Sequence, residues 1–174
     1  SALSSHAYAV PNLKSHDQIP LPFGAQVTVS AEHGNFYQTP AGFIPRQHFR
    51  TTGNFLPDPR AVAQMFLGCP YLWGGNSAAG IDCSGLIQAA CHATGRACPG
   101  DSGPQQEFFP ATEGDWDSGQ LIFWPGHVAL TLSATELIHA NAHAMAVGIE
   151  PIELAIARID AAGDGPMLQR SNLT

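Results

Sequence analysis

The chain has 174 residues, of which 44% are hydrophobic and only 12% are charged, so its composition argues against disorder and allows a small module beside a larger domain. Its formal net charge of −7 argues against a nucleic-acid-binding protein, which needs a basic face. No apolar run is long enough to span a membrane, and no basic start followed by an apolar core predicts a signal peptide within these residues.

Residues 1–50 predict a small all-β module. Residues 25–29 alternate apolar and polar side chains, which predicts a strand, and residues 35–39 and 43–45 predict two more strands around a Pro-Ala-Gly turn. No helical period is visible in this part of the chain. Residues 51–58 combine Gly, Asn and Pro, which is typical of a linker.

Two helices are predicted next. The first spans about residues 59–67, because Asp58 is a good N-cap and a proline opens the first turn. The second spans about residues 83–94, where apolar side chains recur with a helical period between Asp82 as N-cap and Gly95 as a stop.

The rest of residues 59–174 is predicted to be mostly β-structure. The expected elements are strands at 120–124, 127–132, 136–140, 145–152 and 167–170, and a short helix at 153–159.

Cys83 is the first candidate for chemistry, because it lies in the first turn of the second predicted helix. A helix N-terminus carries unpaired N–H groups and a partial positive charge, which favour a thiolate over a thiol. The alternative is a buried structural thiol, since Cys83 also lies on the apolar face of this helix.

Two histidines could supply the base that a nucleophilic thiol needs. If residues 128–132 and 135–138 form a hairpin that turns at Ser133, His127 lies directly opposite His139 on the same face of the sheet. One imidazole could then orient the other, as nucleophilic catalysis requires. The alternative is that each histidine is an ordinary structural residue.

A zinc site is the competing interpretation of one cysteine and two histidines. The sequence holds no HExxH motif, and its four cysteines show no CxxC spacing. We therefore expect no metal, no other cofactor and free cysteine thiols.

Four motifs resemble the NlpC/P60 cysteine peptidases in order and spacing, over about residues 58–160. They are PYLWGG at 70–75, GIDCSGL at 80–86, IFWPGHVA at 122–129 and LIHA at 137–140. The segments LPFG at 21–24 and GFIP at 42–45 resemble a bacterial SH3-type (SH3b) module. The resemblance implies an α+β fold with a small SH3-like barrel followed by a papain-like domain, in which a helix carrying Cys83 packs on an antiparallel sheet.

The same resemblance implies site residues. Cys83 would be the nucleophile, His127 the base and His139 the residue that orients it. Tyr71 would lie near the oxyanion, and Asp82 and Ser84 would hold the free amino end of a substrate.

The implied reaction is hydrolysis of the bond between γ-D-glutamate and a diamino acid, meso-diaminopimelate or lysine, in peptidoglycan stem peptides or free muropeptides. Two alternatives remain: an N-acetylmuramoyl-L-alanine amidase or acyltransferase on the same fold, and a catalytically silent wall-binding protein. The implied compartment is the cytoplasm for recycling or the cell envelope for remodelling, and free cysteines favour the cytoplasm slightly. The sequence predicts no oligomeric state.

Overall fold

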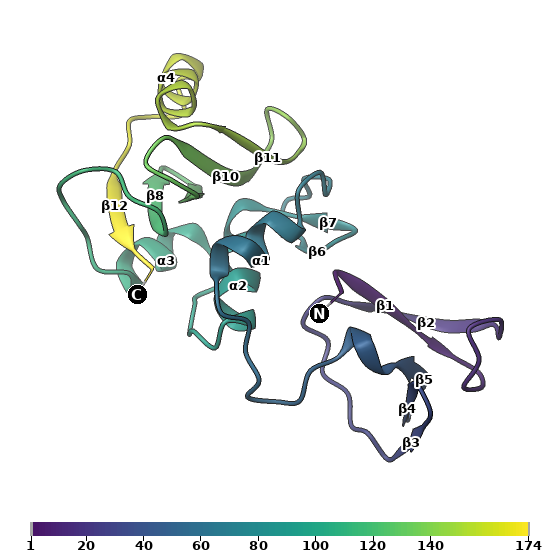
Figure 1. Cartoon of the computed structure of the whole chain (residues 1–174). Coiled ribbons are helices and arrows are strands. Elements are labelled where there is room, and N and C mark those ends of the chain that lie inside the picture. The colour runs from purple at the N-terminus through teal and green to yellow at the C-terminus, as the bar shows by residue number, and fades with distance from the viewer. Residues whose placement is uncertain (1, 174) are drawn as a thin grey trace. The chain divides into compact units, whose positions relative to one another are not determined.

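The computed structural model describes residues 2–173 and divides the chain into two compact units, Ser1–Phe55 and Leu56–Thr174 (Figure 1). The division falls within residues 51–58, where turn-forming residues predicted a linker. Each unit contains its own five-stranded sheet. In the described part of the chain, no helix is both long and apolar enough to cross a membrane.

The first unit is an antiparallel sheet with strand order β2-β1-β5-β4-β3. Its buried apolar residues are few and include Ala7 and Ile44. The elements are β1 (Ser4–Tyr8), β2 (Asp17–Pro22), β3 (Ala31–His33), β4 (Phe36–Thr39), β5 (Gly42–Pro45) and the 3-10 helix η1 (Arg46–His48).

The predicted strands at 35–39 and 43–45 are confirmed as β4 and β5, whereas the strand expected at 25–29 is wrong. Residues 25–30 connect β2 to β3 without pairing as a strand. The alternating side chains of this segment do not produce a strand because its backbone has no partner strand with which to pair. Strands β1 and β2 escaped prediction because their sequences, SSHAY and DQIPLP, are mostly exposed or polar and show no clear apolar face.

The second unit is an α+β domain whose antiparallel sheet has the order β11-β10-β9-β8-β12. Its strands are β6 (Asn76–Ser77), β7 (Gly80–Ile81), β8 (Gln120–Trp124), β9 (His127–Thr131), β10 (Glu136–Asn141), β11 (Ala146–Pro151) and β12 (Gln169–Asn172). Its helices are α1 (Pro59–Met65), α2 (Cys83–Ala93), α3 (Ser102–Phe108) and α4 (Ile152–Ala162).

Most predicted elements of this unit are confirmed within a few residues. Asp58 caps α1 and Asp82 caps α2 through their side chains, as expected. The last helix is longer than the predicted 153–159, and α3 was not predicted. Gly and Pro occupy the second and third positions of α3. Both are poor helix formers, so helix propensity does not predict this helix.

Two helices cover the large sheet and fix where the functional side chains lie. Helix α4 packs on a core cluster built from alternate residues of β8, β9 and β10, including Trp124, Ala129 and Leu137. Helix α2 packs against β9 and β10, and Figure 1 shows α4 and α2 on opposite sides of the sheet. Because side chains alternate along a strand, residues 127 and 139 point to the α4 side.

Candidate active site

Asp82 anchors the start of α2. Its Oδ1 accepts hydrogen bonds from the Gly85 backbone N–H at 2.7 Å and from the Ser84 hydroxyl at 3.1 Å. Its Oδ2 accepts from the Gly74 N–H at 2.9 Å, so one carboxylate ties the helix start to the preceding loop. This is an N-cap with an added loop contact, and it holds the backbone on both sides of Cys83 in place.

Cys83 is the first residue of α2, and its side chain is buried, with 7% of the residue exposed. The thiol donates to the Gly126 carbonyl oxygen at 3.9 Å, directly before His127 in the chain. The thiol therefore lies against the backbone where β9 begins, and its hydrogen-bond partners are backbone groups.

The electrostatics at Cys83 differ from the sequence-based expectation. Burial raises the pKa of the Cys83 thiol, and the Asp82 carboxylate acts in the same direction. The backbone N–H of Val128 on β9 lowers this pKa, and so do the N–H groups of Ser84 and Cys83 at the helix N-terminus, as predicted, but burial has the larger effect. The expected lowering of the thiol pKa is wrong for the ligand-free chain, which holds a neutral thiol.

His127 and His139 meet as predicted, although not through the predicted register. Strand β9 pairs with β10 through Leu130 opposite Ile138, so His139 lies two residues away from the position opposite His127. The connection spans residues 132–135 instead of a tight turn at Ser133. Because a two-residue shift preserves the face of a strand, the rings still meet diagonally, with His127 Nε2 and His139 Nδ1 2.9 Å apart.

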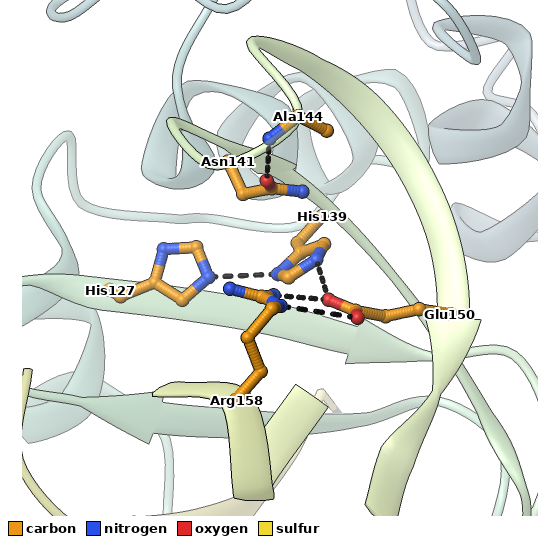
Figure 2. A network of polar contacts seen from close by, with 6 residues as sticks. All are labelled: His127, His139, Asn141, Ala144, Glu150 and Arg158. Atoms are coloured by element: carbon orange, nitrogen blue, oxygen red, sulfur yellow. Dashed lines mark hydrogen bonds and ion pairs between the residues drawn. The ribbon is translucent and has the colours of Figure 1, made fainter. Parts of the chain in front are cut away.

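Two further residues extend this pair, and the sequence analysis missed both. Figure 2 shows His139 between His127 and Glu150, with the Arg158 guanidinium beside His139 and facing the same carboxylate. His139 Nε2 lies 2.7 Å from Glu150 Oε1, although the oxygen is off the ideal N–H direction. Arg158 on α4 donates to both carboxylate oxygens of Glu150. The only sequence signal was an acidic residue in an otherwise apolar strand, followed eight positions later by an arginine.

Burial and charge set the protonation states of His127 and Glu150. Burial lowers the pKa of His127 to about 3, and a positive charge on His139 or on Arg158 acts in the same direction. The hydrogen bond from His139 lowers the pKa of Glu150 to about 2, with help from Arg158 and against the effect of burial. At neutral pH, His127 is therefore a neutral imidazole and Glu150 a carboxylate.

Comparison with known proteins decides the family. The NlpC/P60 family matches residues 68–158, which include Cys83 and both histidines of the pair. The chain belongs to the NlpC/P60 family. It is 30% identical over 146 residues to a γ-D-glutamyl-L-lysine dipeptidyl-peptidase of Bacillus cereus, covering 76% of this chain and 40% of that protein.

Two other relatives agree with this assignment. The peptidoglycan endopeptidase RipB of Mycobacterium tuberculosis is 34% identical over 137 residues, covering 67% of this chain and 55% of that protein. The crystal structure of an NlpC/P60 family protein from Bacillus cereus superposes with a TM-score of 0.73 at 25% identity, covering 87% of this chain and 56% of that chain. The present chain therefore spans about half the length of these relatives.

The remaining predicted site residues of this NlpC/P60 chain lie around the thiol. Tyr71 is half-buried, and its backbone N–H donates to the Met145 carbonyl at 2.9 Å. Burial raises the pKa of its phenol, and charges at Cys83 and Asp82 act in the same direction, which places these three side chains in one electrostatic environment. Ser84 is buried, and its hydroxyl donates to Asp82.

The sequence-based expectations also concerned the cysteines and possible metal ligands. All four cysteines, Cys69, Cys83, Cys91 and Cys98, are free. Within residues 2–173, no group of three or more His, Cys, Asp or Glu side chains is arranged to hold a metal ion.

Proposed function

We propose that this chain is a cysteine peptidase that cleaves the bond between γ-D-glutamate and a diamino acid in peptidoglycan stem peptides or muropeptides. One observation carries the proposal. The thiol of Cys83, at the start of a helix, contacts the backbone directly before His127, and His127 is hydrogen-bonded to His139 on the adjacent strand. Two relatives support this substrate class: one is named a γ-D-glutamyl-L-lysine dipeptidyl-peptidase and the other a peptidoglycan endopeptidase.

In the proposed mechanism, Cys83 attacks the γ-glutamyl carbonyl carbon. The thiol and the His127 imidazole are both neutral at rest, so the thiol proton moves to His127 as the S–C bond forms. The tetrahedral intermediate then expels the amine of the diamino acid, which takes that proton from His127. A water molecule activated by His127 releases the acyl group from the sulfur, and His139 keeps the His127 ring oriented throughout.

The oxyanion of this intermediate would form at the start of α2. The backbone N–H groups of Cys83 and Ser84 lie near the sulfur and are suited to stabilise a negative charge there. The Tyr71 hydroxyl, which shares the electrostatic environment of Cys83, would add a third donor. Its raised pKa keeps the phenol protonated, as a donor must be.

We further propose that Asp82 and Ser84 hold the free amino end of an L-Ala-γ-D-Glu substrate. The Asp82 carboxylate accepts three hydrogen bonds within the chain and has about four acceptor positions, so one remains for an ammonium group. Residues 1–50 would act as an SH3b module. Recycling of small muropeptides in the cytoplasm fits selection of a free amino end better than remodelling of intact wall.

The test is digestion of L-Ala-γ-D-Glu-meso-diaminopimelate, its lysine analogue and an N-acetylated copy, with products identified by mass spectrometry. Cleavage at the γ-glutamyl bond is expected for wild type and for Cys69→Ala, a half-buried cysteine outside the site, and not for Cys83→Ala. Discrimination against the acetylated copy would support the amino-end subsite. Release of L-alanine from a muramoyl substrate instead would identify an amidase, and no product from a folded chain would favour a wall-binding role.

A further inference from the structure

Glu150 and Arg158 form a charged pair that the proposed reaction does not use directly. Both side chains are about three-quarters buried, with exposed fractions of 24% and 25%. Glu150 lies on β11, two residues beyond Gly148, which pairs with His139 across the sheet. The carboxylate is therefore a diagonal neighbour of His139, and Arg158 of α4 contacts it from the adjoining helix (Figure 2).

We infer that Glu150, held in place by Arg158, is a positioning residue that selects the tautomer of His139 and, through it, the tautomer of His127. This inference rests on the proposed function of Cys83 and His127 and extends the site to β11 and α4.

The ionised carboxylate of Glu150 can only accept hydrogen bonds. With Glu150 Oε1 2.7 Å from Nε2 of His139, that nitrogen must carry the proton. The Nδ1 atom of a neutral His139 then has a lone pair, and it lies 2.9 Å from Nε2 of His127. His127 Nε2 must therefore be the protonated nitrogen of its ring.

The tautomer of His127 determines whether its other nitrogen, Nδ1, can accept a proton. With its proton on Nε2, a neutral His127 presents an unprotonated Nδ1 on the side of the ring that points away from His139 (Figure 2). This is the nitrogen that can accept the proton of an attacking thiol. Without the carboxylate, His139 could adopt either tautomer, and in one of them His127 would have to accept rather than donate at Nε2.

Arg158 gives the carboxylate a defined place. It contacts both oxygens of Glu150, one of which is the oxygen that faces His139. Its positive charge keeps Glu150 ionised and also disfavours a positive charge on the His127 imidazole. The groups that face His139 from the elements around it are thus His127 on β9, Glu150 on β11 and Arg158 on α4.

The test measures the tautomers directly, by ¹⁵N NMR of the imidazoles in the full ¹⁵N-labelled chain near pH 7. Signals are assigned with His127→Gln and His139→Gln. The expected wild-type result is a proton on Nε2 in both rings. In Glu150→Leu/Arg158→Leu, which removes the charged pair without leaving one charge buried, both rings should show mixed tautomers. Its kcat should fall about 10- to 100-fold with little change in KM, as for other outer-shell partners.

Two further variants separate positioning from folding. Glu150→Gln keeps an oxygen acceptor and should retain more of kcat than the double variant, whereas Glu136→Gln, an exposed acid on β10, should change neither measurement. A proton on Nδ1 of wild-type His139, or unchanged tautomers and kcat in the double variant, would overturn the inference. If wild type cleaves no stem peptide, the proposed function fails, while the NMR result still decides the tautomer question.

Discussion

His127 and His139 are joined through Nε2 and Nδ1 at 2.9 Å although they are not opposite each other in the β9–β10 hairpin. A diagonal pair on one face of an antiparallel sheet is within reach of long side chains, and two imidazoles can close that distance. The same diagonal relationship brings Glu150 to His139 from the other neighbouring strand. Three side chains on three adjacent strands thus form one row across the sheet.

The first prediction concerns His127 as the base. His127→Ala should lower kcat about 10²- to 10⁴-fold, the range expected for loss of a general base or acid, and should leave KM nearly unchanged. Steady-state kinetics on the diaminopimelate tripeptide would measure both constants. His143→Ala, an exposed histidine after β10, is the matched control and should behave as wild type. Equal kcat in His127→Ala and wild type would contradict the assignment.

The second prediction concerns the resting state of the thiol. Because burial raises the pKa of Cys83, little thiolate should be present at pH 7, and the thiolate should form at a higher pH than for an ordinary cysteine. The absorbance of thiolate near 240 nm, taken as the difference between wild type and Cys83→Ala during a pH titration, would show this. A thiolate signal between pH 5 and pH 7 would instead indicate a resting ion pair with an imidazolium.

The third prediction concerns the stability of the chain at acidic pH. The unfolded chain binds a proton at His127 below about pH 6.5, whereas the folded chain resists it until about pH 3, so stability should fall as the pH drops through this window. Glu150 adds stability that is complete above about pH 4.5 and is lost as the pH falls towards 2.

Urea unfolding at pH 7.5, 6 and 5 would test the histidine contribution. The loss of stability between these values should be smaller in His127→Gln than in wild type, because the variant lacks the His127 imidazole, which burial keeps neutral. His143→Gln should keep the wild-type slope. Parallel curves for wild type and His127→Gln would show that burial of this imidazole does not govern the acid response.

The site illustrates what a sequence can and cannot predict here. The position of Cys83 at a helix start followed from local signals, namely the Asp82 cap and the apolar period of α2. The contact between the histidines followed from strand alternation, which tolerates an error of two residues in register. Glu150 could not be found in this way, because its proximity to His139 depends on the pairing of β10 with β11 and on a helix that packs across both.

The pKa of Cys83 failed as a prediction for a related reason. The helix N-terminus is a local feature and its effect on the thiol is present, but burial is a tertiary property that outweighs it. In the first unit, the alternating segment at 25–29 likewise had a local strand signal and no partner strand. Local sequence patterns predicted the features that depend on a single helix or strand. They did not predict features that depend on burial or on pairing with other elements.

The fourth prediction separates the two roles of Asp82. Asp82→Ala removes the helix cap and should cost about 0.5–2 kcal/mol of stability, whereas Asp82→Asn keeps an oxygen that can accept from the Gly85 N–H and should cost less. If the carboxylate also holds a substrate ammonium, Asp82→Asn should still raise KM for the free-amine tripeptide. Urea unfolding and steady-state kinetics on both variants would distinguish a cap alone from a cap with a binding role.

The last prediction concerns Gly85, two residues after the thiol. A Cβ at this position would lie 2.5 Å from the Gly75 carbonyl oxygen and 3.0 Å from Asp82 Oδ1. Neither atom can retreat easily, because the Gly75 oxygen accepts from the Asp82 N–H at 3.0 Å and the carboxylate is the helix cap. Gly85→Ala should therefore displace the start of α2, cost about 1–3 kcal/mol and reduce kcat.

Gly103 in α3 provides the matched substitution, because a Cβ there meets no atom within 4 Å. Gly103→Ala should be neutral or stabilise the chain by up to about 1 kcal/mol through helix propensity, with kcat unchanged. Urea unfolding and kinetics measured side by side would test the pair. Equal stability of the two variants would mean that the loop at Gly75 moves to make room for the Cβ at position 85. The position of the thiol would then depend on its contact with β9 and not on the close contact between Gly85 and Gly75.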